Sequence, residues 1–189
     1  MPTKQLEILT TYVGDMHALE SHIFQALDKQ VALLASHADA KQQVLVFRDI
    51  LAGHLTALQS RLEALGGSPN HPLKEGVAAA LGVAAGLVDK LRTEEAAKDL
   101  RDDYTALSHS IIAYEMLLTT ALASGDQETA GLARKHMLDN ARFVTRISRF
   151  MPKLVLDELR EDGMTIADSV IADAGAQVAA VWKDSSDLG

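Results

Sequence analysis

Five ionisable side chains stand where a regular helical pattern of apolar residues would place leucine or valine: Glu20, His54, Glu115, His136 and Asp139. A charge in a helical core is costly unless it is paired or bound to a metal ion. Carboxylates and imidazoles that converge inside a helix bundle are suited to holding iron or manganese. We therefore predict that these five residues ligate iron or manganese, with redox or peroxide chemistry at any open coordination position.

Four helical stripes must position these residues. In each stripe apolar side chains recur at alternating spacings of three and four, which is typical of a buried helix face. The predicted stripes are Leu9, Val13, Met16, Glu20, Ile23, Leu27 and Leu34; Val44, Phe47, Leu51, His54, Leu58, Leu62 and Leu65; Leu100, Tyr104, Leu107, Ile111, Glu115, Leu118 and Leu122; and Leu132, His136, Asp139, Phe143, Ile147 and Phe150.

The distances of these residues from the predicted turns place them at similar heights. Glu20 and His54 each lie 17 residues from His37, so antiparallel packing brings them to one level. Glu115 precedes the Gly125–Asp126 turn by 10 residues, and His136 follows Asp126 by 10. We expect all four helices to contribute a ligand near the middle of the bundle.

The turn signals predict an all-α, ferritin-like, antiparallel four-helix bundle with a long crossover between its second and third helices. Short connections near His37 and at Gly125–Asp126 form two hairpins, and Asp126 is the expected N-cap of the fourth helix. The crossover (66–92) is expected to hold a short helix. The fourth helix is expected to end at Pro152. We assign 1–152 to the bundle and 153–189 to a helical extension, capped at Thr165, that packs on the bundle or on a dimer partner.

Composition narrows the class of protein. The chain has 189 residues, a net charge of −8 and no cysteine, which excludes disulfides and thiolate metal sites. The acidic balance makes nucleic acid an unlikely partner. The N-terminus lacks the apolar stretch of a secretory signal, and the run Gly76–Val88 is too short to span a bilayer. We expect a cytoplasmic protein that is not inserted in a membrane.

Several readings stay open. Di-iron bundles carry Glu-x-x-His on two helices; here Leu51 stands three residues before His54, and the fourth helix has the reverse order, His136 before Asp139. A site for one metal is as compatible with the sequence as a site for two. A metal-free bundle, in which the same side chains form a buried hydrogen-bond network, is the alternative. Whether the protein is an enzyme is left open.

Two further features have a bland and a functional reading. Tyr104 and Tyr114 are either neighbours of the metal or ordinary core residues that need one partner for the hydroxyl. Four basic residues at helical spacing form a stripe that would either grip an anion or be a solvated face paired with acids. The members of this basic stripe are Arg142, Arg146, Arg149 and Lys153.

Three segments resemble the YciE/YciF group of ferritin-like bacterial stress proteins. "YVGDMHALESHIFQALDKQV" is similar to the first helix of that group, with Asp15 and Glu20 at matching places. "AYEMLLTTAL" resembles its "HYEIAAYGTL" through Tyr114 and Glu115. "LARKHMLDNARFVTRI" occupies the place of its fourth helix, where Asp139 and the following asparagine replace two glutamates. The resemblance, over residues 5 to 150, implies a ferritin-like fold, a metal-binding, stress-associated role and a homodimer.

The sequence also departs from that group at positions that matter for a di-iron centre. Ile50 and Leu51 stand in the place of a Glu-Thr pair on the second helix, and Ile112 replaces the glutamate that precedes His-Tyr-Glu on the third. The resemblance therefore implies the fold more strongly than it implies a working di-iron centre.

Overall fold

The computed structural model describes residues 3–35, 37–68 and 96–186, and five α-helices form its framework. They are α1 (Thr3–Leu33), α2 (Ala38–Ala64), α4 (Ala96–Ala123), α5 (Gln127–Glu161) and α6 (Ser169–Ser186). The described residues contain no strand, so the predicted all-α class is confirmed. The short crossover helix and the apolar run Gly76–Val88 lie outside the described residues.

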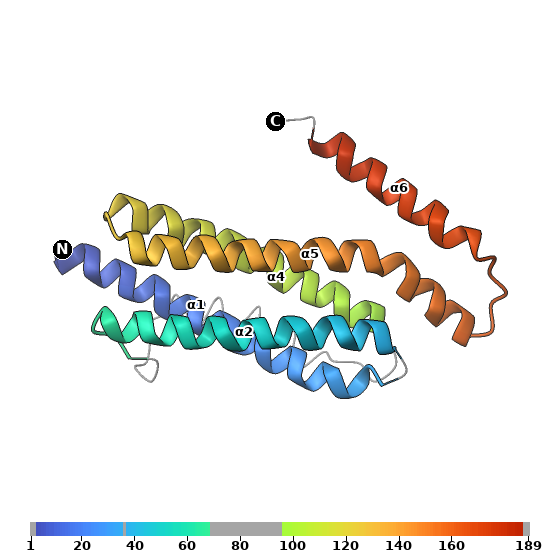
Figure 1. Ribbon diagram of the computed structural model, residues 1–189, viewed down its shortest axis with the longest axis horizontal. Coiled ribbons are helices and arrows are strands. Elements are labelled where there is room, and N and C mark those ends of the chain that lie inside the picture. Colours follow the sequence, from blue (N-terminus) through green and yellow to red (C-terminus); the bar gives the residue numbers. More distant parts are fainter. Residues whose placement is uncertain (1–2, 36, 69–95, 187–189) are drawn as a thin grey trace.

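Four of the helices pack in a ring around one core. α1 packs against α2 and α4, and α5 packs against α2 and α4, while the diagonal helices α1 and α5 meet through side chains at the centre, where Asn140 contacts Glu20. α1 and α5 run in one direction along the bundle, and α2 and α4 run in the other (Figure 1). This is the arrangement that two short hairpins require when the chain crosses the length of the bundle between them.

The ends of the bundle are fixed by specific polar contacts. Asp126 caps α5, as predicted, by accepting a hydrogen bond from the Thr129 amide at 3.0 Å. Arg61, near the end of α2, forms an ion pair with Asp126 and donates to Glu128 at 2.6 Å and to Thr129 Oγ1 at 2.8 Å. Because one guanidinium contacts both the N-cap and the first turn of α5, it fixes the position of α2 along the axis of α5.

The buried face of α4 differs from the predicted stripe by one residue over most of its length. Its members at alternating spacings of three and four are Leu100, Asp103, Leu107, Ser110, Tyr114, Leu117 and Ala121. Glu115 is exposed, so its predicted place in the core is wrong. Apolar side chains such as Ile112, Met116 and Leu122 are also exposed on this helix. Because one residue turns a helix by about 100°, apolar residues on both faces left two rotations almost equally favoured.

The fourth helix of the bundle also continues beyond its predicted end. α5 contains Pro152 and ends at Glu161 rather than at the proline. A proline inside a helix removes one backbone hydrogen bond and clashes with the carbonyl four residues before it. α5 bends towards its C-terminal end, and α6 then runs back apart from the bundle (Figure 1). α6 begins at Ser169, so Thr165 is not its N-cap.

α4 is, among the described helices, the one that is long and apolar enough to cross a membrane by length and composition. Core helices of soluble proteins meet the same criterion. α4 packs against α1 and α5 within the bundle. Its apolar composition is accounted for by these two neighbours together with the apolar residues that it leaves on its outer face.

The rotation of α4 can be tested with two neighbouring substitutions. Leu117→Ala, at a position with 0% exposure, is expected to destabilise the protein by about 2–5 kcal/mol because it opens a cavity in the core. Glu115→Ala is expected to change stability by less than about 0.5 kcal/mol, since the side chain is in solvent. Urea unfolding of both variants measures this. A larger loss for Glu115→Ala than for Leu117→Ala would contradict the observed rotation.

Candidate metal centre

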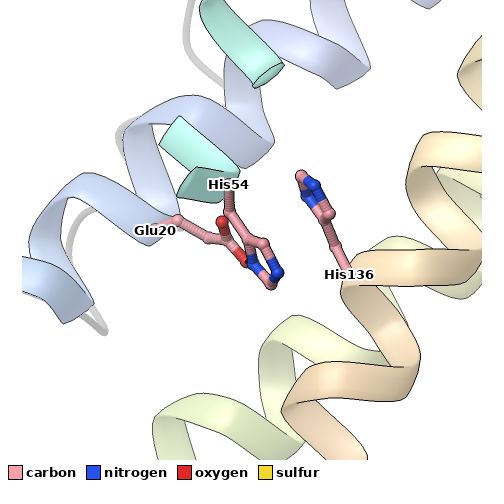
Figure 2. Close-up of side chains that lie close together, drawn as sticks. All are labelled: Glu20, His54 and His136. Atoms are coloured by element: carbon pink, nitrogen blue, oxygen red, sulfur yellow. The ribbon is translucent and has the colours of Figure 1, made fainter. Parts of the chain in front are cut away.

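Three helices bring Glu20, His54 and His136 together at the centre of the bundle (Figure 2). They come from α1, α2 and α5, and their exposed fractions are 0%, 1% and 2%. One potential ligand atom from each residue lies within 4.8 Å of the others. One carboxylate and two imidazoles in an enclosed site form a donor set that suits iron, manganese and related metals.

His54 is held by carboxylates at both ring nitrogens. Nδ1 lies 3.2 Å from Glu20 Oε1, and Nε2 lies 3.3 Å from Asp139 Oδ2. The contact between Glu20 and His54 confirms that these two residues lie at one height. His54 therefore links the carboxylate of Glu20 on α1 to that of Asp139 on α5.

Asp139 lies at the rim of this site rather than in its centre. Its side chain is 18% exposed and also contacts Lys135 at 3.3 Å and Arg142 at 3.4 Å. Burial raises the pKa of Asp139, but hydrogen bonds from His54 and Lys135 outweigh burial and hold the pKa below its usual range. The carboxylate therefore stays charged and reaches the centre through His54.

His136 is a neutral imidazole. Burial lowers its pKa to about 3, and the nearby positive charges of His54 and Lys135 act in the same direction. Its ring stacks on that of His54, with 3.6 Å between ring centroids and an angle of 9° between the planes. Nδ1 is 2.9 Å from the Tyr114 hydroxyl, while Nε2 has no hydrogen bond within the described part of the chain. A neutral imidazole with one free nitrogen is the form that ligates metals.

Tyr114 occupies the place in the core that the sequence assigned to Glu115. Its ring meets His136 edge to face, with 5.4 Å between centroids. Burial raises the pKa of Tyr114 well above its ordinary value, and the charge and hydrogen bonding of Glu20 add to the rise. The hydroxyl therefore stays protonated. It lies between Glu20 and His136 and fixes the orientation of the imidazole.

Glu20 is only partly satisfied by its neighbours. Asn140 Nδ2 donates to Glu20 Oε1 at 3.3 Å and also to Ser110 Oγ. Glu20 Oε2 is buried and has no hydrogen-bond partner among the residues that the structure describes. A buried carboxylate oxygen without a partner is costly. A metal ion beside Glu20 would remove that cost, so the chemistry of the donor set fits a cation.

The spacing of the three residues fits a metal after a small adjustment. A metal held at about 2.1 Å from each ligand keeps any two ligand atoms within about 4.2 Å. The separations here extend to 4.8 Å, and the two imidazole rings are nearly parallel. Rotation of the rings about their side-chain bonds would bring the nitrogens together. Binding would also replace a proton or hydrogen bond at His54.

The structure thus gathers three of the five predicted ligands, leaves Asp139 at the rim and leaves Glu115 outside. Sequence reasoning left Tyr114 open as a neighbour of the metal or an ordinary core residue, noted Asn140 only as a replacement for a glutamate, and missed Ser110. Ser110 and Tyr114 are four residues apart in line with Leu107 and Leu117, which is the spacing of one helix face. That spacing was the signal that could have identified them.

A second group of buried polar side chains lies nearer the start of α4. Asp103 is 6% exposed, and its Oδ2 has no hydrogen-bond partner in the described residues. Burial raises the pKa of Asp103 to about 8, and the charges of Asp99 and Asp102 add to the rise. Asp103 is therefore protonated in the folded protein at neutral pH.

The raised pKa of Asp103 predicts a pH dependence of stability. Between the unfolded value of 3.8 and the folded value of about 8, the folded chain holds a proton that the unfolded chain has lost. Stability should therefore fall as pH rises through this range, by up to about 1.4 kcal/mol per pH unit for one group. Asp103→Asn, of the same size but without the ionisation, should be more stable than the native protein at pH 8.

Urea unfolding at pH 5, 6.5 and 8 measures this difference. Asp49→Asn is the matched control, because Asp49 is an aspartate paired with Arg48 at 3.0 Å on the surface and is not among the charges that raise the pKa of Asp103. Stability curves for Asp103→Asn and the native protein that run parallel across this range would contradict a protonated Asp103.

Comparisons with known proteins agree with this architecture. A crystal structure of a protein from Xanthomonas campestris pv. campestris superposes with a TM-score of 0.71 at 17% sequence identity, covering 85% of this chain and 99% of the other. At this identity the likeness shows a shared fold. No curated protein matches the sequence. Residues 4–160 match the family described as a domain of unknown function, DUF892. The chain belongs to the DUF892 family.

Proposed function

We propose that this protein is a ferritin-like bundle that binds one iron or manganese ion through Glu20, His54 and His136. The observation that carries the proposal is the meeting of three buried donor residues, one of which, Glu20, has a carboxylate oxygen without a partner among the described residues. The resemblance to the YciE/YciF group supports a ferritin-like fold and a stress-associated role. Two histidines and one carboxylate are also the donor set of non-haem iron sites with open coordination positions.

The residues around the site favour one metal over two. Di-metal bundles place a second carboxylate three residues before each histidine. Here those positions are Leu51 and Ala133, both with 0% exposure. Glu115 faces solvent. Two carboxylates, Glu20 and Asp139, are thus left near the two histidines, which is too few to bridge and balance two divalent ions.

The chain's own residues would orient the ligands and limit access. Tyr114 would hold His136 through Nδ1 so that Nε2 faces the centre, and Asn140 would fix Glu20 through Oε1. Such outer contacts commonly change metal affinity by 10–100-fold when they are lost. Bound iron would supply redox chemistry towards oxygen or peroxide. Asp139, at the rim, would accept a hydrogen bond from the ring nitrogen of His54 that faces it.

A second candidate function is a metal-free structural bundle. It is supported by the contacts that His54 already makes with carboxylates at 3.2 Å and 3.3 Å, which join three helices without a metal. In that case the buried charges would fix the register of α1, α2 and α5. The two functions differ in what the loss of one of these side chains would change, which is the bound metal in the first case and the stability of the fold in the second.

The test is elemental analysis of protein purified without chelator or affinity-tag metal, before and after incubation with ferrous iron and with manganese. We expect close to one metal per chain. Glu20→Gln and His136→Leu should each lose the metal, Tyr114→Phe should weaken its affinity about 10–100-fold, and Glu115→Ala should bind as the native protein does. Circular dichroism checks that each variant is folded.

Three outcomes would count against the proposal. Folded protein that takes up neither metal would favour the structural network, and Glu20→Gln would then lose about 3–5 kcal/mol of stability with no change in metal content. Two metals per chain would contradict a mononuclear site. Loss of metal in Glu115→Ala would contradict the assigned ligands.

A further inference from the structure

A cavity of about 530 Å³ lies between α6 and the outer face of α4 and α5. α6 packs on α5 but makes no packing contact with α4, so a space remains over the outer side of α4. Its walls are mainly apolar or aromatic: Tyr104, Ile111, Val144, Val178 and Trp182. An adjoining cavity of about 460 Å³ shares Tyr104, Val178 and Trp182. We refer to the two together as the α6 groove.

Polar contacts hold α6 across this groove. Trp182 Nε1 donates to Ser148 Oγ at 3.0 Å. Near the start of α6, Arg160 donates to the carbonyl of Ile166 at 3.2 Å and to Asp168 at 2.7 Å. Both ends of the helix are thus attached to α5, while its middle spans the groove. Trp182 remains 54% exposed, so one edge of its indole is available to a ligand.

Arg149 is the charged residue of the α6 groove that has no partner. In the basic stripe, Arg142 contacts Asp139 at 3.4 Å, Arg146 contacts Gln43 at 3.4 Å, and Lys153 is paired with two aspartates. Arg149 makes no hydrogen bond or ion pair within the described residues, and it lines the cavity beside Thr145 and Ser148. A guanidinium with hydroxyls close by, at the border of an apolar space, is suited to a carboxylate.

Gly175 keeps part of the groove open. It lies in α6 and lines the cavity, and a Cβ atom added there would meet no atom within 4 Å. Glycine inside a helix is unfavourable by about 0.5–1 kcal/mol relative to alanine. Gly175 therefore makes α6 less stable than alanine would, and it leaves the adjacent space unfilled. It also offers a way to block the groove without distorting the backbone.

We propose that the α6 groove binds a long-chain carboxylate. The apolar chain would lie against Tyr104, Ile111 and Val178, and the carboxylate would accept hydrogen bonds from Arg149 at the border. The volume lies in the range of about 300–1,000 Å³ that is usual for small-molecule sites. A ligand that is polar throughout would leave the apolar walls unmatched, and an uncharged apolar ligand would leave Arg149 without a partner.

The groove carries its own spectroscopic probe, because Trp182 is the only tryptophan of the chain. Sodium dodecanoate, titrated below its micelle concentration, should change the fluorescence of Trp182 in a saturable way, with one ligand per chain by calorimetry. Arg149→Gln should weaken binding about tenfold, as expected for one charged hydrogen bond of about 1.5 kcal/mol. Gly175→Leu should abolish binding while the helical circular dichroism is retained.

Three controls sharpen the test. Arg142→Gln removes a charge from the same helix that is already paired with Asp139 and should bind dodecanoate normally. Dodecanol, which has the chain without the charge, should bind native protein about as weakly as dodecanoate binds Arg149→Gln. Vesicles containing phosphatidylglycerol test whether the anion is presented by a membrane instead of free in solution. The titration is repeated in His136→Leu, so that a failed metal site and a failed groove are told apart.

The proposal is overturned if the fluorescence of Trp182 shows no saturable change or if Arg149→Gln binds dodecanoate as tightly as the native protein. It is overturned as well if the protein binds phosphatidylglycerol vesicles but does not bind free dodecanoate. It is also overturned if sedimentation shows a dimer that Gly175→Leu converts to monomer without any effect of dodecanoate. In that case the occupant of the groove is a second copy of the chain.

Discussion

The position of Glu20 is the constraint on which the rest of the bundle depends. Its carboxylate has no exposed surface, and a buried charge of this kind requires a counter-charge and hydrogen bonds from nearby helices. His54 contacts this carboxylate from α2, and Asn140 supplies a hydrogen bond from α5. α1, α2 and α5 can therefore pack in only one register, because a shift of one helix would leave Glu20 unpaired.

The two helical hairpins and the contacts of Arg61 set that register. The short connection near His37 sets Glu20 opposite His54, and the turn at Gly125, with its φ of +70°, sets α4 opposite α5. Arg61 then ties α2 to the start of α5. Since helices are stiff along their axes, contacts at the ends of the bundle fix the heights of side chains at its centre.

Heights could be predicted from the sequence more reliably than rotations. Height depends on counting residues from a turn, and the contact between Glu20 and His54 bears this out. Rotation depends on the contrast between apolar and polar faces, and α4 has apolar residues on both, so Glu115 was placed in the buried stripe and Tyr114 was left outside it. The same error of one residue exchanged Asn140 for Asp139 on α5. The course of α5 through Pro152 and the stand-off of α6 from α4 depend on tertiary packing, which local pattern does not encode.

Charge balance explains why a site that lacks the carboxylates of a di-metal bundle suits one divalent ion. Glu20 and Asp139 together carry two negative charges, and a single divalent ion beside neutral histidines would leave the site with no net charge. Without a metal, the two carboxylates contact the ring nitrogens of His54, and Lys135 and Arg142 at the surface also pair with Asp139. A second divalent ion would leave two unbalanced positive charges in a buried core, which is strongly unfavourable. Leu51, Ala133 and the outward rotation of Glu115 therefore belong together: each removes a carboxylate that only a second metal would need.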